Sequence, residues 1–398
     1  MTEPTLTEDR LFELIDRDTV ASLAARLVRA PGENPPGQEQ ATVDVLLEAC
    51  RAFELDHRVD PVRPGRPNLT VRLPGGERPG LLLLGHSDVV PVGDGWTVDP
   101  HAGTIRDGRL YGRGAADMKG GLAAMLVAMA AARRARIPVS GPVELAVTMD
   151  EEEAALGIGQ YVASGDRGDF LGCVVGEPTD LQPITAARGD AYLTIAIRGR
   201  AAHAGRPSDG LNAIDAAGQV IADLWQWHHE LAADAHPLVG PATSSIGLID
   251  GGAGASIVAA DCRLTVDRRL LPTETGEQVL DQLRRRLDRL RLVEDGYRLS
   301  TELSLDMPGF ETPPEDPLVQ AVTAGDAQAG GPRLPPGGWT AACDGGFLAR
   351  DAGLPVVVYG PGSVEQEAHR ADESVPLDQL VIAARSYLSI ILRLLGVP

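Results

Sequence analysis

Two residues with reactive side chains, His86 and Asp88, lie at the end of an apolar run, LLLLGHSDVV, which spans residues 81–90. The run predicts a buried strand, and residues two positions apart on a strand face the same side of it. A carboxylate beside an imidazole can select the imidazole tautomer and make it a better metal ligand. A core histidine whose hydrogen bond is satisfied by Asp88 would give the same pattern. The stretch by itself therefore leaves a metal site and a core histidine as alternatives.

Other acidic residues and one more histidine follow predicted strand ends, begin a predicted helix or lie in a late loop. Ligands of open α/β sheets bind outside the carboxyl ends of the strands, so these side chains could converge there. Each has an ordinary explanation when taken alone, as a helix cap, a solvated turn or a hydrogen-bonded corner. Two histidines with several carboxylates suit Zn²⁺ or a similar divalent ion, and one carboxylate can bridge two ions roughly 3.5–4 Å apart. The residues are Asp117, Glu151, Glu152, Glu153, Glu177 and His369.

The elements that would position these residues alternate between strands and helices. Residues 1–55 predict two helices around the proline-rich loop APGENPPGQEQ. Two strands follow, at NLTVRLPG and GLLLLGHSDVV, and a helix begins near Asp117. Later strands precede the acidic turn at Glu151 and the Gly-Glu-Pro corner at Glu177. This alternation predicts an α/β sheet with helices on both faces.

The pattern changes between about residues 188 and 305. Strands and helices there follow the order β-α-β-β-α-β, which is typical of a ferredoxin-like unit. A chain of 398 residues also exceeds the size at which one hydrophobic core stops growing. We therefore expect a first domain formed by residues 1–187 and 306–398, with a second domain, residues 188–305, inserted into it.

Composition excludes several classes of function. The formal net charge of −20 disfavours a nucleic-acid track or an anionic membrane surface, both of which need clustered lysine and arginine. The stretch MTEPTLTEDRLFEL lacks a signal-peptide pattern, and no apolar run reaches the ~18 residues of a membrane helix. The cysteines, Cys50, Cys173, Cys262 and Cys343, are widely spaced and form no CxxC pair. Reduced thiols and a cytoplasmic location are the expectation.

The chain resembles the M20 metallopeptidases and deacylases. That family includes acetylornithine deacetylase, succinyl-diaminopimelate desuccinylase, aminoacylase-1 and glutamate carboxypeptidase. The motifs GHSDVVP, DGRLYGRGAADMKGG, TMDEEEA, VVGEPTD and the late GPG…AHRADE match the family in order and spacing over essentially the whole chain. The resemblance implies a mixed-sheet catalytic domain of the di-zinc aminopeptidase type, with an inserted lid and dimerisation domain. It also implies a homodimer formed through that inserted domain.

The resemblance assigns roles to the residues at the strand ends. Two divalent ions are implied, most often Zn²⁺, with Co²⁺ or Mn²⁺ as alternatives. Asp117 would bridge them, the Asp117–Met118 peptide bond would be cis, Asp88 would orient His86, and Glu151 would be the general acid and base. One ion would be held by His86, Asp117 and Glu177, and the other by Asp117, Glu152 and His369.

The inserted segment supplies two further matches. His203, in GRAAHAGRP, resembles the family histidine that stabilises an oxyanion, often in the partner subunit's site, and Arg269, in VDRRLLP, resembles the arginine that binds a substrate carboxylate. Arg268 beside it leaves that register open by one residue. The chain departs from the desuccinylases at two places, where Ser256-Ile257 and Ala341-Ala342-Cys343-Asp344 stand. Succinyl-diaminopimelate is therefore not the expected substrate.

The resemblance implies a metal-dependent amidohydrolase. The expected reaction removes the acyl group of an N-acyl amino acid by attack of a water held between the ions. A dipeptidase or carboxypeptidase of the same family is the alternative enzyme. A metal-binding homologue without catalysis is the alternative of another class, although the retained Glu151 disfavours it. A small N-acyl amino acid or short peptide is the expected partner, with no nucleic acid and no membrane.

Overall fold

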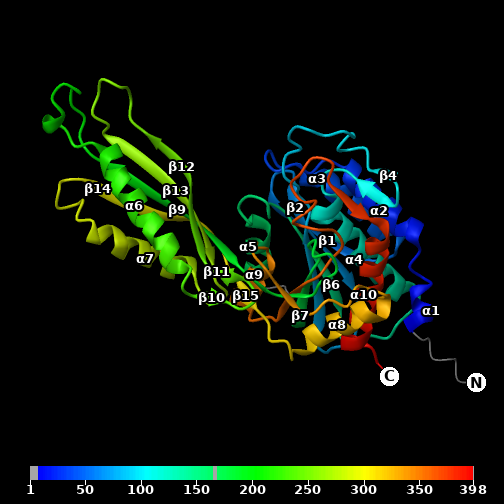
Figure 1. Cartoon of the computed structure of the whole chain (residues 1–398). Coiled ribbons are helices and arrows are strands. Elements are labelled where there is room, and N and C mark those ends of the chain that lie inside the picture. Colours follow the sequence, from blue (N-terminus) through cyan, green and yellow to red (C-terminus); the bar gives the residue numbers. More distant parts are fainter. Residues whose placement is uncertain (1–7, 165–167, 398) are drawn as a thin grey trace, which may run out of the picture. The chain divides into compact units, whose positions relative to one another are not determined.

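The computed structural model describes residues 8–164 and 168–397, which form two compact units (Figure 1). The first unit contains Met1–Thr185, Glu311–Gly337 and Phe347–Pro398, and the second contains Ala186–Phe310 and Gly338–Gly346. The main segment of the second unit thus runs from Ala186 to Phe310, where the sequence placed the boundaries at 188 and 305. The segment Gly338–Gly346 also belongs to it, which the sequence did not indicate.

A mixed sheet, most of whose strands belong to the first unit, has the order β1-β2-β6-β3-β7-β17-β8-β15, with β16 paired to β8. Strand β3 is parallel to both β6 and β7, and β7 is parallel to β17. The carboxyl ends of these strands therefore lie at one edge of the sheet, as the sequence led us to expect. The bounds are β1 (Asp56–Arg63), β2 (Arg66–Leu73), β3 (Gly80–His86), β6 (Val143–Thr148), β7 (Phe170–Val175), β8 (Ile184–Ala187), β15 (Phe310–Glu311), β16 (Gly337–Trp339) and β17 (Val356–Val358).

Helices cover this sheet and bury β3 on both faces. Leu81 and Leu83 share a core with α2, α4, α8 and α10, while Leu82 and Leu84 are buried outside that cluster. Helix α5 packs on β1, β2 and β6, and its buried Ile158 also lies outside the cluster. The helices are α1 (Glu8–Phe12), α2 (Arg17–Arg29), α3 (Glu39–Ala52), α4 (Gly120–Arg134), α5 (Leu156–Ala163), α8 (Pro317–Ala329), α9 (Gly345–Ala352) and α10 (Leu377–Leu395).

The first unit differs from the sequence-based prediction at several elements. The segment before residue 55 forms α1, α2 and α3, where two helices were predicted. Strand β1 and a small sheet of β4 (Thr104–Arg106), β5 (Arg109–Tyr111) and β18 (Ser374–Pro376) were not predicted. The segment Ala115–Arg134 meets the length and composition of a membrane span, but 89% of its apolar window is buried inside the protein, and its regular helix is α4, Gly120–Arg134.

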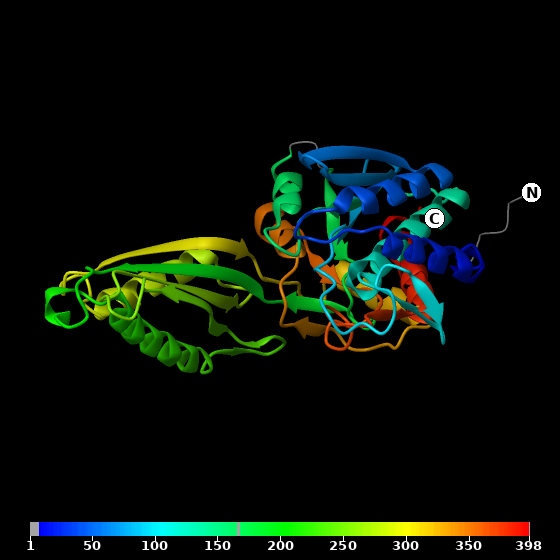
Figure 2. The ribbon, with the colours of Figure 1, turned by 90° about the horizontal axis from the view of Figure 1, so that it is seen from above.

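The second unit contains the antiparallel sheet β12-β13-β9-β14, and the predicted β-α-β-β-α-β order is confirmed. Helices α6 and α7 share one apolar core with β9 and β13, so both cover the same face of the sheet (Figure 1, Figure 2). A short hairpin of β10 and β11 follows α6. The bounds are β9 (Gly189–Arg198), α6 (Ala213–Leu231), β10 (Ala235–His236), β11 (Gly240–Pro241), β12 (Thr243–Gly251), β13 (Asp261–Leu270), α7 (Gly276–Arg289) and β14 (Arg298–Met307).

Candidate dinuclear metal centre

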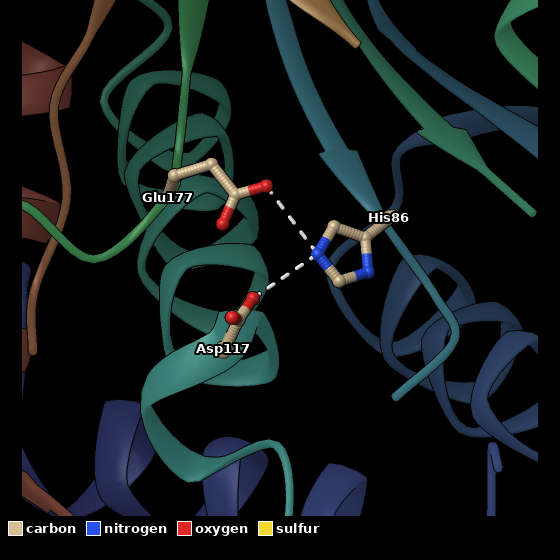
Figure 3. A group of neighbouring side chains, drawn as sticks. All are labelled: His86, Asp117 and Glu177. Carbon is tan, nitrogen blue, oxygen red and sulfur yellow. Dashed lines mark hydrogen bonds and ion pairs between the residues drawn. The ribbon is translucent and has the colours of Figure 1, made fainter. Parts of the chain in front are cut away.

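His86 is the last residue of β3 and is buried, with 2% of its surface exposed. Its Nδ1 lies 3.0 Å from the backbone oxygen of Asp88 and 3.6 Å from the Asp88 carboxylate. Its Nε2 lies 3.2 Å from Asp117 Oδ1 and 3.3 Å from Glu177 Oε1 (Figure 3). The expected pair is present, but the backbone of Asp88 approaches Nδ1 more closely than its carboxylate does. Either contact leaves Nε2 facing the two other carboxylates.

Asp117 lies in a distorted turn, Ala115–Lys119, directly before α4, and not at a helix cap. Its φ and ψ of −116° and 98° are not helical, and the Asp117–Met118 peptide bond is cis, as the resemblance implied. The buried Glu373 holds this turn, because its Oε1 accepts the backbone N–H of Ala116 at 2.9 Å and of Asp117 at 3.1 Å. Oε2 of the same carboxylate bonds Arg113 at 2.6 Å.

The second oxygen of Asp117 faces a second group of side chains. Oδ2 lies 3.4 Å from His369 Nε2, which also lies 3.1 Å from Glu152 Oε2. Potential ligand atoms of His86, Asp117 and Glu177 lie within 4.8 Å of one another, as do those of Asp117, Glu152 and His369. Asp117 belongs to both groups, with one oxygen toward each histidine. This arrangement matches a carboxylate shared by two cations.

The charges of the two groups favour cations. Burial, and then the charge of Asp117, raises the pKa of Glu177 to about 8 and also raises the pKa of Glu152. Hydrogen bonds to Asp117 and Glu152 raise the pKa of His369 to about 10. Burial opposes protonation of His86, but Glu177 and Asp117 outweigh it and raise its pKa. Oε1 of Glu152 is buried and has no hydrogen-bond partner among residues 8–164 and 168–397. Divalent ions fit this donor set of imidazoles and crowded carboxylates.

Glu151 and Glu152 occupy one turn but differ in their surroundings. The backbone N–H groups of both donate to the Asp88 carboxylate, each at 3.2 Å. The side chain of Glu152 is 7% exposed and joins the second group, whereas Glu151 belongs to neither group. Asp150, directly before them, has a left-handed φ of 69°. The turn therefore directs the side chain of Glu152 toward the candidate ions, while Glu151 stands outside both groups.

His203 and Arg269 belong to the second unit. His203 is exposed, and its backbone pairs with Ile257 across an isolated bridge. Strand β13 places Arg268 on the helix-covered face, where it is fully buried against Trp227 and bonds Glu274 at 2.7 Å. Arg269 faces the other side and is bonded by two carboxylates, Asp267 at 2.9 Å and Asp190 at 3.2 Å. The sequence left open whether Arg268 or Arg269 matches the family arginine. In the structure Arg269 lies on the face of the sheet that α6 and α7 do not cover.

Several buried polar residues around the groups were not predicted as part of the site. Asn34 lies in a loop that the sequence marked only as a helix breaker, and Asp150 and Glu373 lie within the motifs TMDEEEA and AHRADE. Lys119 is 1% exposed and donates to the backbone oxygen of Ala30 at 2.7 Å. The motifs could have flagged Asp150 and Glu373. Lys119 likewise lies within the motif DGRLYGRGAADMKGG. Asn34 carries no local signal, because its partners are distant in sequence.

The comparisons with known proteins agree with this geometry. A family model described as Peptidase family M20/M25/M40 matches residues 82–393. The chain belongs to this family. An acetylornithine deacetylase of Vibrio vulnificus (strain CMCP6) is 32% identical over 344 residues, which cover 85% of this chain and 87% of that protein. The M20 assignment made from the motifs is therefore confirmed, and as a member of a peptidase family the chain is a hydrolase of amide bonds.

Solved structures of M20 proteins share the fold. The aminopeptidase PepT of Bacillus cereus ATCC 10987 superposes with a TM-score of 0.76 at 21% identity, covering 96% of this chain and 99% of that one. The YXEP protein of Bacillus subtilis, described as a dinuclear metal binding peptidase of the M20 family, gives a TM-score of 0.73 at 15% identity, covering 94% and 97%. These likenesses confirm the predicted fold class, a mixed-sheet M20 domain with a second α+β unit.

Proposed function

We propose that this M20 protein is a metal-dependent deacylase that hydrolyses an N-acyl amino acid to a carboxylic acid and a free amino acid. The observation that carries the proposal is Asp117, whose two oxygens face His86 and His369, with Glu151 on the adjoining turn. The acetylornithine deacetylases of several bacteria, similar at about a third identity over most of the chain, support this substrate class over a peptide.

Two divalent ions would be held by the two groups, Zn²⁺ first, with Co²⁺ or Mn²⁺ as alternatives. When bound, they would polarise the amide carbonyl and lower the pKa of water. Glu151 would remove a proton from the attacking water as its oxygen adds to the carbonyl carbon. The same carboxyl group would then donate that proton to the nitrogen as the carbon–nitrogen bond breaks. Glu151 would thus act as the general base in the attack of water and as the general acid in the release of the amine.

The residues of the second unit have proposed substrate roles. His203 would donate a hydrogen bond to the oxyanion, and Arg269 would bind the carboxylate of the amino acid with its planar pair of N–H groups. Arg269 already bonds Asp267 and Asp190. A substrate carboxylate would have to displace Asp267, whose side chain is 32% exposed, and not Asp190, which is 6% exposed.

The first test is the variant Glu151→Gln. The amide cannot accept the proton, so we expect hydrolysis to fall by at least ~1,000-fold, in line with the loss of a general base that also delivers the proton. Metal content, measured by inductively coupled plasma mass spectrometry, should stay near that of the parent, because Glu151 lies in neither ligand group. Parent-like activity would rule out Glu151 as the base.

A second test concerns the ions and the substrate. Chelation should stop turnover, and Zn²⁺, Co²⁺ and Mn²⁺ added back singly should restore it to different extents. A panel of N-acetyl, N-succinyl and N-formyl amino acids beside dipeptides, assayed for released amine, distinguishes a deacylase from a dipeptidase or carboxypeptidase. Turnover of dipeptides alone would contradict the deacylase proposal. Full activity in a preparation verified to be metal-free would contradict the metal mechanism.

We also propose a cytoplasmic homodimer formed through the second unit. Strand β12 lies at an edge of its sheet and exposes Leu248 and Ile249, at 68% and 58%. Trp225 of α6 is 65% exposed. An uncovered edge with apolar side chains is a typical site for a second copy of the chain. The four cysteines are widely spaced and form no CxxC pair, which supports the proposed reducing compartment.

A further inference from the structure

We propose that Asn34 is a positioning residue for the turn that carries Glu151 and Glu152, an inference that rests on the proposed function. Its Nδ2 donates to Asp88 Oδ2 at 3.0 Å and to Asp150 Oδ1 at 2.9 Å. All three side chains are nearly inaccessible, with Asn34 3% exposed. One amide group therefore joins the segment after β3 to the turn after β6 through two buried carboxylates.

Backbone contacts fix Asn34 in place. The N–H of Asn34 donates to the oxygen of Val89, and the N–H of Val89 donates to the oxygen of Gly32, each at 2.9 Å. Glu33 and Val89 form a parallel bridge. Lys119 Nζ donates to Ala30 at 2.7 Å, at the start of the same loop. The loop is therefore an extension of the sheet edge, and the amide of Asn34 is held independently of the turn that it contacts.

Arg66 also bonds Asp150, the carboxylate that Asn34 contacts on the turn after β6. Its Nη2 donates to Asp150 Oδ1 at 2.7 Å, and its Nε lies 2.9 Å from Glu39 Oε2, with Glu39 fully buried. Gly37 has a φ of +93°, and a Cβ at that position would lie 2.4 Å from Arg66 Nε. The loop that carries Asn34 thus closes tightly over the arginine that bonds Asp150.

The charges explain why an amide is required at Asn34. Asp88 and Asp150 are both carboxylates, and each N–H of a single amide satisfies one of them without adding charge. The two oxygens of Asp88 also accept the backbone N–H groups of Glu151 and Glu152. Asn34 thus fixes the Asp88 carboxylate, and that carboxylate fixes the backbone N–H groups of Glu151, the proposed base, and Glu152, a candidate metal ligand. The position of His86 depends less on these contacts, because its Nδ1 lies nearer the backbone oxygen of Asp88 than the Asp88 carboxylate.

The expected effect follows from this geometry. Loss of an outer partner of a metal site lowers metal affinity or activity about 10–100-fold. Asn34→Ala should lower kcat by that factor and leave KM within about twofold, because no contact of Asn34 involves the groups proposed to bind substrate. It should weaken the ion held with Glu152 more than the ion held with Glu177.

The test compares Asn34→Ala with Asn68→Ala. Asn68 is also buried and bonds the backbone on either side of the Glu151 turn, at Met149 and at Gly157 in α5, but it bonds neither Asp88 nor Asp150. Stepwise Zn²⁺ affinity is measured by competition with a chelator of known affinity, beside kcat, KM and hydrogen exchange of residues 149–156. A loss of Zn²⁺ affinity at one of the two binding steps, together with a loss of kcat, in Asn34→Ala and not in Asn68→Ala supports the proposal. Equal losses in both variants, or affinities and kcat within twofold of the parent, overturn it.

Arg66 keeps the proposal testable if Asn34→Ala does not fold. Arg66→Ala should likewise lower kcat and leave KM nearly unchanged. Arg66→Lys keeps a cation beside Asp150 and should recover most of the lost kcat. Arg66→Ala with parent-like Zn²⁺ affinity and kcat overturns the proposal. The Zn²⁺ readout needs no turnover. If Asn34→Ala selectively lost Zn²⁺ affinity while Glu151→Gln remained active, Glu151 would be refuted as the base. The positioning role of Asn34 would still stand.

Discussion

The carboxylate of Asp117 belongs to both groups of candidate metal ligands, whereas Glu177 and Glu152 each belong to one. Its Oδ1 faces His86 and its Oδ2 faces His369. Burial opposes its charge, but hydrogen bonds with His369 and His86 outweigh that effect and lower its pKa. A residue in this position cannot be replaced by a neutral isostere without affecting both candidate ion sites.

Metal stoichiometry tests this difference. Glu177→Gln should reduce bound metal from about two ions per chain to about one, whereas Asp117→Asn should remove both, because only Asp117 belongs to both groups. Glu153→Gln is the matched control on the same acidic run, since Glu153 is exposed. Inductively coupled plasma mass spectrometry after gel filtration gives the counts. Equal metal content in Asp117→Asn and Glu177→Gln would contradict a shared carboxylate.

Asp190 predicts a pH dependence of stability in the second unit. Burial raises its pKa to about 7, and Arg269 only partly offsets this effect. The folded state therefore retains a proton that the unfolded chain loses near pH 4, so stability falls as the pH rises from about 4 to 7 and is level above that range. Thermal unfolding of Asp190→Asn should show a smaller fall in melting temperature between pH 5 and 8 than the parent. A parent-like pH slope would contradict the assignment.

At the scale of elements, the site depends on how closely α4 approaches the ends of β3 and β7. Gly85 of β3 faces Met118, and Gly121 of α4 lies against the backbone of Gly176, one residue before Glu177. A Cβ on Gly121 would lie 2.1 Å from the oxygen of Gly176. The two glycines allow Asp117 and Glu177 to lie at neighbouring ends of different elements.

Gly121→Ala tests this packing. The new methyl group must push α4 away from β7, so we expect a loss of about 1–3 kcal/mol of stability and weaker metal binding. Gly218→Ala in α6 is the control, because a Cβ there meets nothing within 4 Å and should stabilise the helix by about 0.5–1 kcal/mol. Thermal unfolding and metal analysis check both variants. Undiminished stability and metal content in Gly121→Ala would contradict the close approach.

At the scale of the whole molecule, the uncovered edge of β12 predicts the oligomeric state. Leu248→Asp with Ile249→Asp should convert a dimer to monomers, because two charges on an edge strand oppose pairing with a second copy. Val293→Asp changes an equally exposed apolar residue, at 65%, in the loop after α7 and should leave the dimer intact. Sedimentation velocity distinguishes the outcomes. A parent that sediments as a monomer would refute the proposed homodimer.

Local patterns were enough to predict much of the fold. The β-α-β-β-α-β order of the second unit, strand β3 and the final helix α10 follow from periodicity and turn residues. Strand β1 was missed because none of its residues is buried and it contains a proline. The sheet of β4, β5 and β18 was missed because its strands are short and β18 lies more than 260 residues from its partner β5.

The sequence by itself determined which residue types gather at the edge of the sheet, because their motifs are local and three of them follow the parallel neighbours β3, β6 and β7. Only the tertiary structure decided how those side chains are held. Asn34 reaches Asp150 across 116 residues, Glu373 reaches Asp117 across 256, and Arg269 faces Asp190 on a neighbouring strand. Such pairs depend on where distant segments meet after the core has packed, and no spacing along the chain encodes that distance.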